Sequence, residues 1–393
     1  MIENFGNKAP WPYFADDEIQ AVTEVLQSGN VNQWTGKEVE NFQKEFAQLC
    51  KVKHAIALSN GTVALELALK SLGIGSGDEV IVTPRTFIAS ASCVALQGAT
   101  PVFVDVDPVS QNISAETIRR VITPRTRAII VVHLAGWPCD MDPIMDLAHE
   151  YDLKVIEDCA QAHGAKYKGR PVGSIGDVAA FSFCQDKIMS TGGEGGMLLI
   201  NDDDVWAFSW AYKDHGKNFE SVYHKSHPPG FRWLHDSFGT NWRMTEMQAA
   251  IGRIQLGKLP KWVDTRRRNA SILTERFSNL ECLRVTVPPP EIFHSYYKYY
   301  AFVRPAFLKP GWDRDRIMNR IVEHGVPCFS GSCSEIYLEK AFADCNLQPN
   351  KRLPVAQNLG ETSLMFLVHP TLSEDMISAA ADVVESVLKA ATK

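Results

Sequence analysis

The chain has 393 residues, of which 45% are hydrophobic and 22% charged, and 46 acidic residues against 40 basic ones give it a net charge of −6. These values are typical of a globular protein with two or three domains, and they exclude a disordered chain, a collagen-like repeat and a coiled coil. The chain lacks the surplus of Lys and Arg that would indicate nucleic-acid binding, and its longest apolar run, residues 128–135, is too short to span a bilayer.

Short apolar segments alternate with longer amphipathic segments from about residue 51 to residue 200. Seven of the short segments are predicted to be strands, at residues 54–58, 79–83, 101–104, 128–132, 154–158, 178–183 and 197–200. Four of the longer segments have helical periodicity, at residues 62–72, 87–97, 115–121 and 141–151. Residues 128–132 are apolar at every position, as in a parallel strand that is covered on both faces. The alternation therefore predicts a three-layer α/β domain.

The sequence changes character after residue 205. Residues 213–242 are rich in Gly, Pro, His and aromatic residues without clear periodicity, and a loop of that length is usually functional. A helix is predicted at 246–259, and Pro288–Pro290 are predicted to interrupt regular secondary structure. A strand at 296–303 and an amphipathic helix at 375–390 indicate a second, smaller domain.

Ligands of open α/β sheets bind beyond the carboxyl ends of the strands, and three of these ends carry unusual residues. The first is Ser59–Thr62, between a predicted strand and a predicted helix. Gly61 permits a tight turn, and the free amides that follow it would point at an anion such as phosphate. Taken alone, however, these four residues favour an ordinary helix cap by Ser or Asn.

The second strand end carries Asp158, followed three residues later by Gln161. A buried aspartate is costly unless it meets a positive charge or a strong donor, and a protonated pyridine nitrogen would be such a partner. Gln161 could lie on the same side of the turn and reach a neighbouring oxygen. A solvated loop carboxylate and a metal ligand are the alternative interpretations of Asp158.

The third strand end carries Ser182, then Lys187, then the glycine-rich run Gly192–Gly196. A lysine is usually a surface residue, but desolvation beside another cation can make its amine nucleophilic towards aldehydes. The glycine run lacks the Gly-Lys-Ser/Thr ending of a phosphate-binding P-loop. A phosphate cradle, a buried acid and a later lysine, in this order, are together the parts needed to hold pyridoxal phosphate.

At these residues the chain resembles the DegT/DnrJ/EryC1/StrS family of pyridoxal-phosphate-dependent nucleotide-sugar aminotransferases. The matching segments occur in the family's order, at residues 59–65, 77–81, 157–164, 182–196 and 239–244. The resemblance implies the aspartate-aminotransferase fold, with a large α/β/α domain built on a mostly parallel seven-stranded sheet and a smaller α+β C-terminal domain. We assign residues 1–255 to the large domain and residues 256–393 to the small one.

The resemblance also implies which residues act on the cofactor ring. Lys187 would bond to the cofactor and then carry the proton during amino transfer. Asp158 would keep the ring nitrogen protonated, and Gln161 would contact the phenolic oxygen of the ring. Phe87 would stack on the ring.

The remaining residues carried over from the family concern the phosphate. The amides of Gly61 and Thr62 would bind it together with Ser182. Asn241 would reach across an interface to the partner's phosphate, so a homodimer with two shared sites is expected. No metal ion is expected in the reaction.

Two positions depart from the pattern of the family. Cys184–Asp186 replaces a His-Pro or similar pair before Lys187, and an acid beside the lysine would favour its charged form if the two side chains approach. Arg85 stands where a small or polar residue is expected. Related dehydratases have His in place of the lysine, so Lys187 argues against that branch.

By resemblance, glutamate would donate the amino group to a keto group of a nucleotide-linked deoxysugar, in surface polysaccharide or glycan precursor synthesis. Arg232 and Lys225 are candidates for binding the diphosphate, because basic side chains favour phosphate. Nine cysteines without a Cys-x-x-Cys pair, and no visible secretory signal, predict a cytoplasmic protein. Dehydration or another reaction on the same cofactor, and a regulatory protein that retains the fold, are the alternatives.

Overall fold

The apolar segments of the first half of the chain form one seven-stranded sheet in the computed structural model, which describes residues 9–393. Its strands are β1 (His54–Leu58), β2 (Glu79–Val82), β3 (Thr100–Phe103), β4 (Thr126–Val132), β5 (Lys154–Asp158), β8 (Val178–Ser182) and β9 (Gly196–Ile200). Their order is β1-β9-β8-β5-β4-β2-β3. All neighbouring pairs from β8 to β3 are parallel, whereas β9 is antiparallel to both of its neighbours. The predicted seven-stranded, mostly parallel sheet is confirmed.

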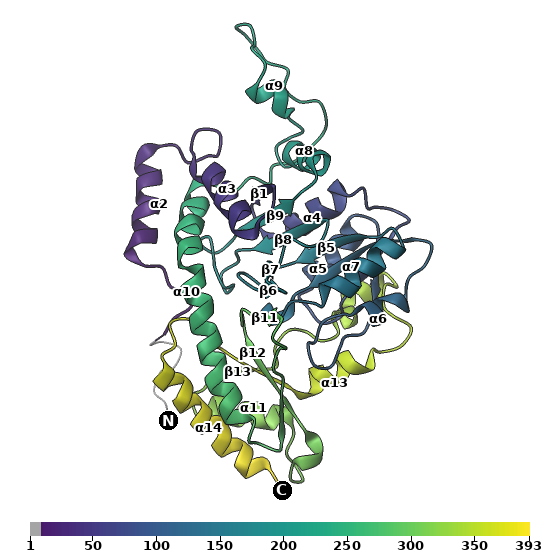
Figure 1. Ribbon diagram of the computed structural model, residues 1–393, viewed down its shortest axis with the longest axis vertical. Helices are drawn as coiled ribbons and strands as arrows, with labels where there is room; N and C mark the ends of the chain where they lie inside the picture. The colour runs from purple at the N-terminus through teal and green to yellow at the C-terminus, as the bar shows by residue number, and fades with distance from the viewer. Residues whose placement is uncertain (1–8) are drawn as a thin grey trace.

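Helices cover both faces of this sheet, because its central strands are apolar on both sides. In β4, Ile130 packs into the cluster that includes α4 (Gly61–Ser71) and α5 (Ala89–Leu96). Ile129 and Val131 pack on the other face, into the cluster that includes α6 (Ala115–Arg119) and α7 (Met141–Glu150). The helices of this part are α2 (Asp16–Ser28), α3 (Glu38–Cys50), α4 (Gly61–Ser71), α5 (Ala89–Leu96), α6 (Ala115–Arg119), α7 (Met141–Glu150) and α8 (Asp203–Tyr212). The three-layer arrangement is therefore also as predicted (Figure 1).

The long helix α10 (Glu246–Phe277) runs along both parts of the molecule (Figure 1). Its start matches the prediction, where Thr245 and Gln248 form a capping box, but it continues well beyond the predicted end at residue 259. Pro260 stands inside the helix, which is held on both sides of that residue by packing against α2, α3 and α14 (Glu374–Ala391). The domain boundary predicted between residues 255 and 256 falls within α10, and the division into two domains stays a prediction.

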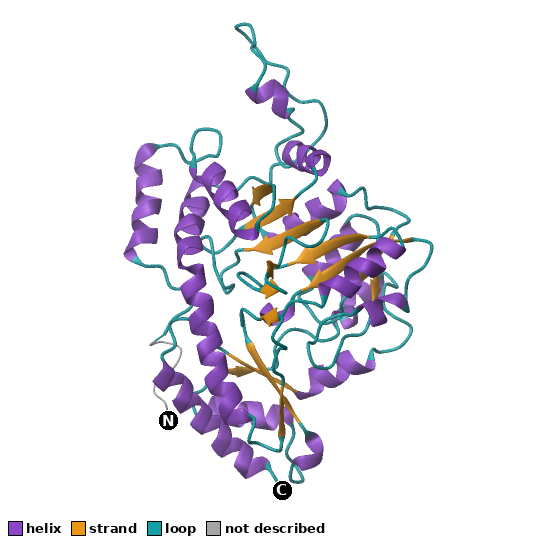
Figure 2. Cartoon of the chain, in the orientation of Figure 1, coloured by secondary structure: helices purple, strands orange, loops and turns teal. Residues whose placement is uncertain are grey.

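A smaller antiparallel sheet organises the C-terminal part of the chain (Figure 2). Its strand order is β10-β12-β14-β13. Its strands are β10 (Leu283–Val285), β12 (Tyr299–Val303), β13 (Cys328–Phe329) and β14 (Ser363–Phe366). The helices of this part are α11 (Arg314–Glu323), α12 (Lys340–Asp344), α13 (Pro354–Thr362) and α14 (Glu374–Ala391). Two-residue strands β6 (Lys166–Tyr167), β7 (Arg170–Pro171) and β11 (Ile292–Phe293) form a third sheet between the two parts.

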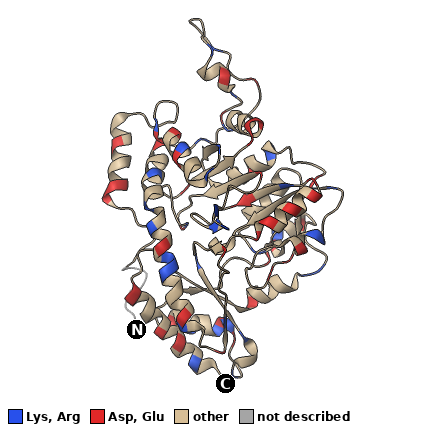
Figure 3. Cartoon of the chain, viewed as in Figure 1, with Lys and Arg blue, Asp and Glu red and all other residues tan. Residues whose placement is uncertain are grey.

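Residues 213–242, which we call the arm, project from the body of the molecule (Figure 1). The arm is irregular as predicted, except for the short helix α9 (Phe219–Tyr223), which Asn218 caps. Basic and acidic residues are interspersed along the chain (Figure 3). None of the helices in residues 9–393 combines the length and the apolar character that a membrane span requires.

Candidate functional site

A cavity of about 1300 Å³ lies between the carboxyl ends of the sheet strands and the C-terminal part. It is larger than most small-ligand pockets, so a cofactor and a substrate fit in it together. Seven of the predicted site residues line it: Gly61, Thr62, Phe87, Asp158, Gln161, Ser182 and Lys187. Three others do not line it, namely Asn241, Arg232 and Lys225, which belong to the arm.

The N-terminus of α4 combines a helix cap with free amides. Asn60 Oδ1 accepts a hydrogen bond of 3.0 Å from the amide of Val63, so the cap interpretation is correct. The amides of Gly61 and Thr62 donate to no protein group within residues 9–393, which leaves the positive end of the helix open to an anion. A Cβ on Gly61 would lie 2.6 Å from Ser182 Cβ, so only glycine brings these amides and the Ser182 hydroxyl together.

Asp158 is a buried carboxylate without a basic partner. Its Oδ2 accepts a hydrogen bond of 2.7 Å from the Ser90 hydroxyl, and its Oδ1 accepts one of 3.1 Å from the amide of Ala160. No Lys, Arg or His forms an ion pair with it in the part of the chain that the structure describes. Burial raises the pKa of Asp158 above its ordinary value, and a cationic ring nitrogen would reverse that effect. The solvated-carboxylate interpretation is therefore wrong.

Gln161 and Phe87 present the groups that a planar ring requires. The backbone amide of Ala135 donates a hydrogen bond of 2.8 Å to Gln161 Oε1. Because that amide can only donate, the Nε2 group of Gln161 is left to donate to a ligand oxygen. The Phe87 side chain is 66% exposed although it lines the cavity, so a face of its ring is available for stacking.

Lys187 lies at the wall of the cavity with a side chain that is only 15% exposed. Its Nζ is 3.9 Å from Asp186 Oδ1, so the neighbouring acid does approach the lysine. The Tyr297 hydroxyl donates to the same carboxylate, and Lys298 Nζ lies 3.9 Å from its Oδ2. The Trp11 indole donates a hydrogen bond of 2.9 Å to the carbonyl of Lys187, which ties the segment to the N-terminal region.

Three side chains near Asp158 could in principle bind a metal ion, but their nitrogen and oxygen atoms already form hydrogen bonds within the protein. His133, Glu157 and Cys159 are the one such group within residues 9–393. His133 Nδ1 accepts from the amide of Cys139, so Nε2 carries the hydrogen that is shared with Glu157 at 3.0 Å. Glu157 also accepts from three backbone amides. Burial would raise the pKa of Glu157, but the hydrogen bond from His133 lowers it. The group fixes the end of β5 rather than presenting lone pairs to a metal ion.

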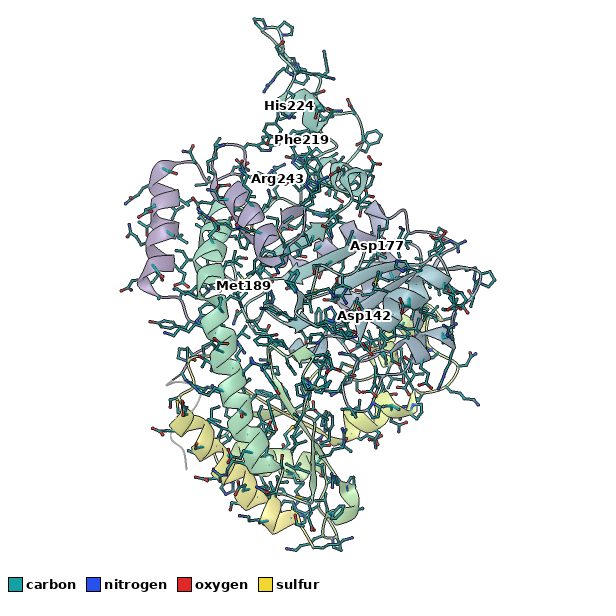
Figure 4. The ribbon with its side chains drawn as sticks, in the orientation of Figure 1. Asp142, Asp177, Met189, Phe219, His224 and Arg243 are labelled. Atoms are coloured by element: carbon teal, nitrogen blue, oxygen red, sulfur yellow. The ribbon has the colours of Figure 1, made fainter. Side chains whose placement is uncertain are left out.

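The arm carries a cluster of basic residues at its base, next to Asn241. The Asp214 carboxylate, fully buried, pairs with Lys217 and Arg243, and Asp214 forms a β-bridge with Asn241. Burial lowers the pKa of Lys213 to about 8. Figure 4 places Phe219 and His224 on the arm and Arg243 at its base. Arg232 is exposed and Lys225 Nζ is 3.4 Å from the Ser221 hydroxyl, so neither meets the cavity of its own chain.

Sequence reasoning missed three residues of the site: Ser90, Tyr297 and Lys298. Ser90 lies in the first turn of α5, the helix that follows Phe87, where its hydroxyl also meets Thr86 Oγ1 at 2.9 Å. Tyr297 and Lys298 precede β12 of the other sheet, and no local pattern distinguishes them from ordinary strand-flanking residues.

The family model of the DegT/DnrJ/EryC1/StrS aminotransferases matches residues 12–387. The chain belongs to this aminotransferase family. The predicted family of sugar aminotransferases and the aspartate-aminotransferase type of fold are confirmed.

Individual relatives agree with this assignment over 70% or more of the chain. A GDP-perosamine synthase of Escherichia coli O157:H7 is 35% identical over 366 residues, 93% of this chain and 94% of that protein. A GDP-perosamine synthase of Caulobacter vibrioides is 47% identical over 277 residues, 70% of this chain and 71% of that protein. The solved aminotransferase of Psychrobacter cryohalolentis is 56% identical, with a TM-score of 0.96 over 98% of this chain and 99% of that chain.

Proposed function

We propose that this enzyme transfers an amino group from glutamate to a keto group of a nucleotide-linked deoxysugar, with pyridoxal phosphate bound in the cavity. One observation carries the proposal. Three separate strand ends bring Asp158, Lys187 and the free amides at the N-terminus of α4 to the same cavity. These are a buried acid, an amine and an anion site, and they fit the ring nitrogen, the aldehyde and the phosphate of that cofactor.

The residues of the chain hold the cofactor and move protons, while the bound cofactor supplies an electron sink. Asp158 keeps a proton on the ring nitrogen. Gln161 Nε2 donates to the ring oxygen, and Phe87 covers one face of the ring and excludes water. Lys187 Nζ would take a proton from the donor carbon and return it during the transfer.

The proposed acceptor class follows from the relatives. The GDP-perosamine synthases named above are named for a GDP-linked product, and we extend to this chain only the class of nucleotide-linked keto sugars. Surface polysaccharide or glycan precursor synthesis is the pathway class that we propose. The basic arm residues, including Arg232 and Lys225, stay candidates for binding the diphosphate across a subunit interface.

We also propose a homodimer with shared sites. Asn241 lies outside the cavity of its own chain, beside the basic cluster at the base of the arm. An anion of a second copy, such as the cofactor phosphate, would complete that cluster.

The purified protein tests the amino-transfer step directly. We expect a visible absorbance band from bound cofactor that L-glutamate shifts to the amine form, with release of 2-oxoglutarate. No shift with any common amino acid would count against transamination. Keto sugars linked to UDP, dTDP and GDP then identify the acceptor, and a product that has lost a hydroxyl group without gaining nitrogen would favour the dehydratase alternative.

A lysine variant tests the covalent site. In Lys187→Ala we expect a folded protein that no longer retains cofactor after borohydride reduction, because the amine that forms the bond is missing. Circular dichroism serves as the control for folding. Continued trapping of the cofactor by the variant would place the reactive amine elsewhere.

A further inference from the structure

Two lysine side chains share one carboxylate at the wall of the cavity. The Nζ atoms of Lys187 and Lys298 each lie 3.9 Å from a different oxygen of Asp186. They also lie over the ring of Tyr297, at 5.0 and 4.6 Å from its centroid. The proposed function uses Lys187 and leaves Lys298 without a role, although Lys298 also lines the cavity.

The ammonium group of Lys298 is incompletely paired. Its side chain is only 16% exposed, and Nζ donates no hydrogen bond to a group of residues 9–393 that meets ordinary hydrogen-bond distances. Burial lowers the pKa of Lys298 to about 8, although the charge of Asp186 opposes this shift. Burying an ammonium group whose N–H donors lack acceptors costs free energy, unless a ligand accepts hydrogen bonds from them.

The surroundings of Lys298 carry more positive than negative charge. Arg266 is also buried, and its guanidinium donates to the carbonyl of Tyr297 at 3.1 Å and lies over the Trp11 ring. It forms no ion pair with an acid within residues 9–393. Asp186 is therefore one carboxylate among the three cations Lys187, Lys298 and Arg266, and this corner of the cavity attracts an anion.

We propose that Lys298 binds the α-carboxylate of the amino-acid donor. Asp186 and Tyr297 would hold the ammonium group of Lys298 in position. This inference rests on the proposed function. The α-carboxylate is attached to the carbon that carries the transferred amino group, so it must lie near Lys187. The diphosphate of a nucleotide sugar is several bonds away from the keto carbon, and the cofactor phosphate has its own site at Gly61 and Thr62. A carboxylate at Lys298 would supply the charge-assisted hydrogen bond that the amine lacks.

Binding of α-methylglutamate to the cofactor-loaded enzyme tests this inference by calorimetry. This compound has the amino group and both carboxylates but no α-hydrogen, so it binds without being converted. We expect Lys298→Met to weaken its binding about tenfold or more, and Lys298→Arg, which keeps the charge, to remain within about threefold of wild type. The matched control is Lys261→Met, which removes an exposed lysine from α10 and should change nothing. A donor analogue without the α-carboxylate, 4-aminobutanoate, should bind equally to wild type and Lys298→Met.

The visible absorbance of each variant shows that the cofactor is retained, and Lys298→Gln repeats the measurement should the methionine variant lose it. Equal binding of α-methylglutamate to wild type and Lys298→Met, or no binding to wild type, would overturn the inference. If Lys298→Met weakened the binding of the nucleotide sugar alone, the inference would be overturned as well, because the Lys298 amine would then bind the acceptor. A different result would contradict the proposed function instead. In that case α-methylglutamate would bind in a manner that depends on Lys298, but the enzyme would release no 2-oxoglutarate from L-glutamate.

Discussion

Asp158 illustrates how a site residue can lower the stability of the protein when no ligand is bound. It accepts hydrogen bonds from Ser90 and Ala160 but forms no ion pair with a basic side chain within residues 9–393. Those two donors stabilise the charged form less than burial disfavours it, so the pKa of Asp158 lies above its ordinary value. In the proposed function, a protonated ring nitrogen would offset this loss of stability.

The first prediction at this scale concerns the cofactor-free protein. A carboxyl group whose pKa is raised by folding lowers the free energy of unfolding above that pKa, and the loss disappears as the pH falls towards the ordinary value of about 4. We expect Asp158→Asn to raise the free energy of unfolding of the cofactor-free protein at pH 8 by about 1–2 kcal/mol, and the gain to shrink on acidification. Urea denaturation at several pH values measures both effects.

The same substitution should act in the opposite direction on the loaded enzyme, because it removes the partner of the ring nitrogen. Cofactor affinity, followed by absorbance, should fall in Asp158→Asn. A variant that is less stable than wild type at pH 8 without cofactor, or equally stabilised at every pH, would contradict the account of Asp158 as an unpaired carboxylate.

At the scale of elements, the turn from β1 into α4 serves two purposes with successive residues. Asn60 satisfies the amide of Val63, and Gly61 lets the start of the helix lie against the end of β8 at Ser182. A Cβ on Gly196 of β9 would similarly lie 2.2 Å from the carbonyl oxygen of Asn60. The anion site therefore depends on close packing of three chain segments as well as on the helix dipole.

We accordingly expect Gly61→Val to weaken cofactor binding at least about tenfold and to lower the free energy of unfolding by about 1–3 kcal/mol, because the added side chain forces α4 away from Ser182. Cofactor titration and urea denaturation measure the two effects. The control is Gly75→Ala, whose Cβ would lie at an ordinary 3.7 Å from the carbonyl oxygen of Gln97. Unchanged cofactor affinity in Gly61→Val would show that the amides of α4 do not hold the phosphate.

At the scale of the whole molecule, the arm exposes apolar side chains that a single copy of the chain leaves uncovered. Its side chains Phe231, Trp233 and Phe238 are 77%, 84% and 99% exposed, and large exposed apolar groups gathered in one segment typically mark an interface. The base of the arm adds Lys213, Lys217 and Arg243 around one buried aspartate. An apolar tip and a basic base are both suited to a second copy, which would cover the former and bring an anion to the latter.

Mixing two inactive variants tests the shared site. Lys187→Ala and Asn241→Ala should each be inactive alone. After subunit exchange in equal amounts, about a quarter of the sites should combine an intact lysine from one subunit with an intact asparagine from the other, and that fraction of activity should return. Affinity capture through a tag on one variant checks that mixed dimers form, and each variant incubated alone is the control. Mixed dimers without recovered activity would show that Asn241 does not serve its partner.

The sequence by itself determined the sheet, the family and the residues at the strand ends. Strand periodicity, helix caps and glycine turns are local features, so β1, β5 and β8 and the positions of Gly61, Asp158 and Lys187 could be predicted without coordinates. Helix α10 was predicted too short, because packing against α2, α3 and α14 holds it together past Pro260 and local propensity does not include such contacts.

Only the tertiary structure decided which side chains meet at the cavity wall. Asp186 and Tyr297 are 111 residues apart in the chain and belong to different parts of the molecule, and Lys298 joins them from the segment before β12. No periodicity links such positions, because their proximity results from how the two parts pack. The same reason applies to Arg85, which is fully buried against Gln111 and Ser363 although its sequence neighbours gave no sign of it.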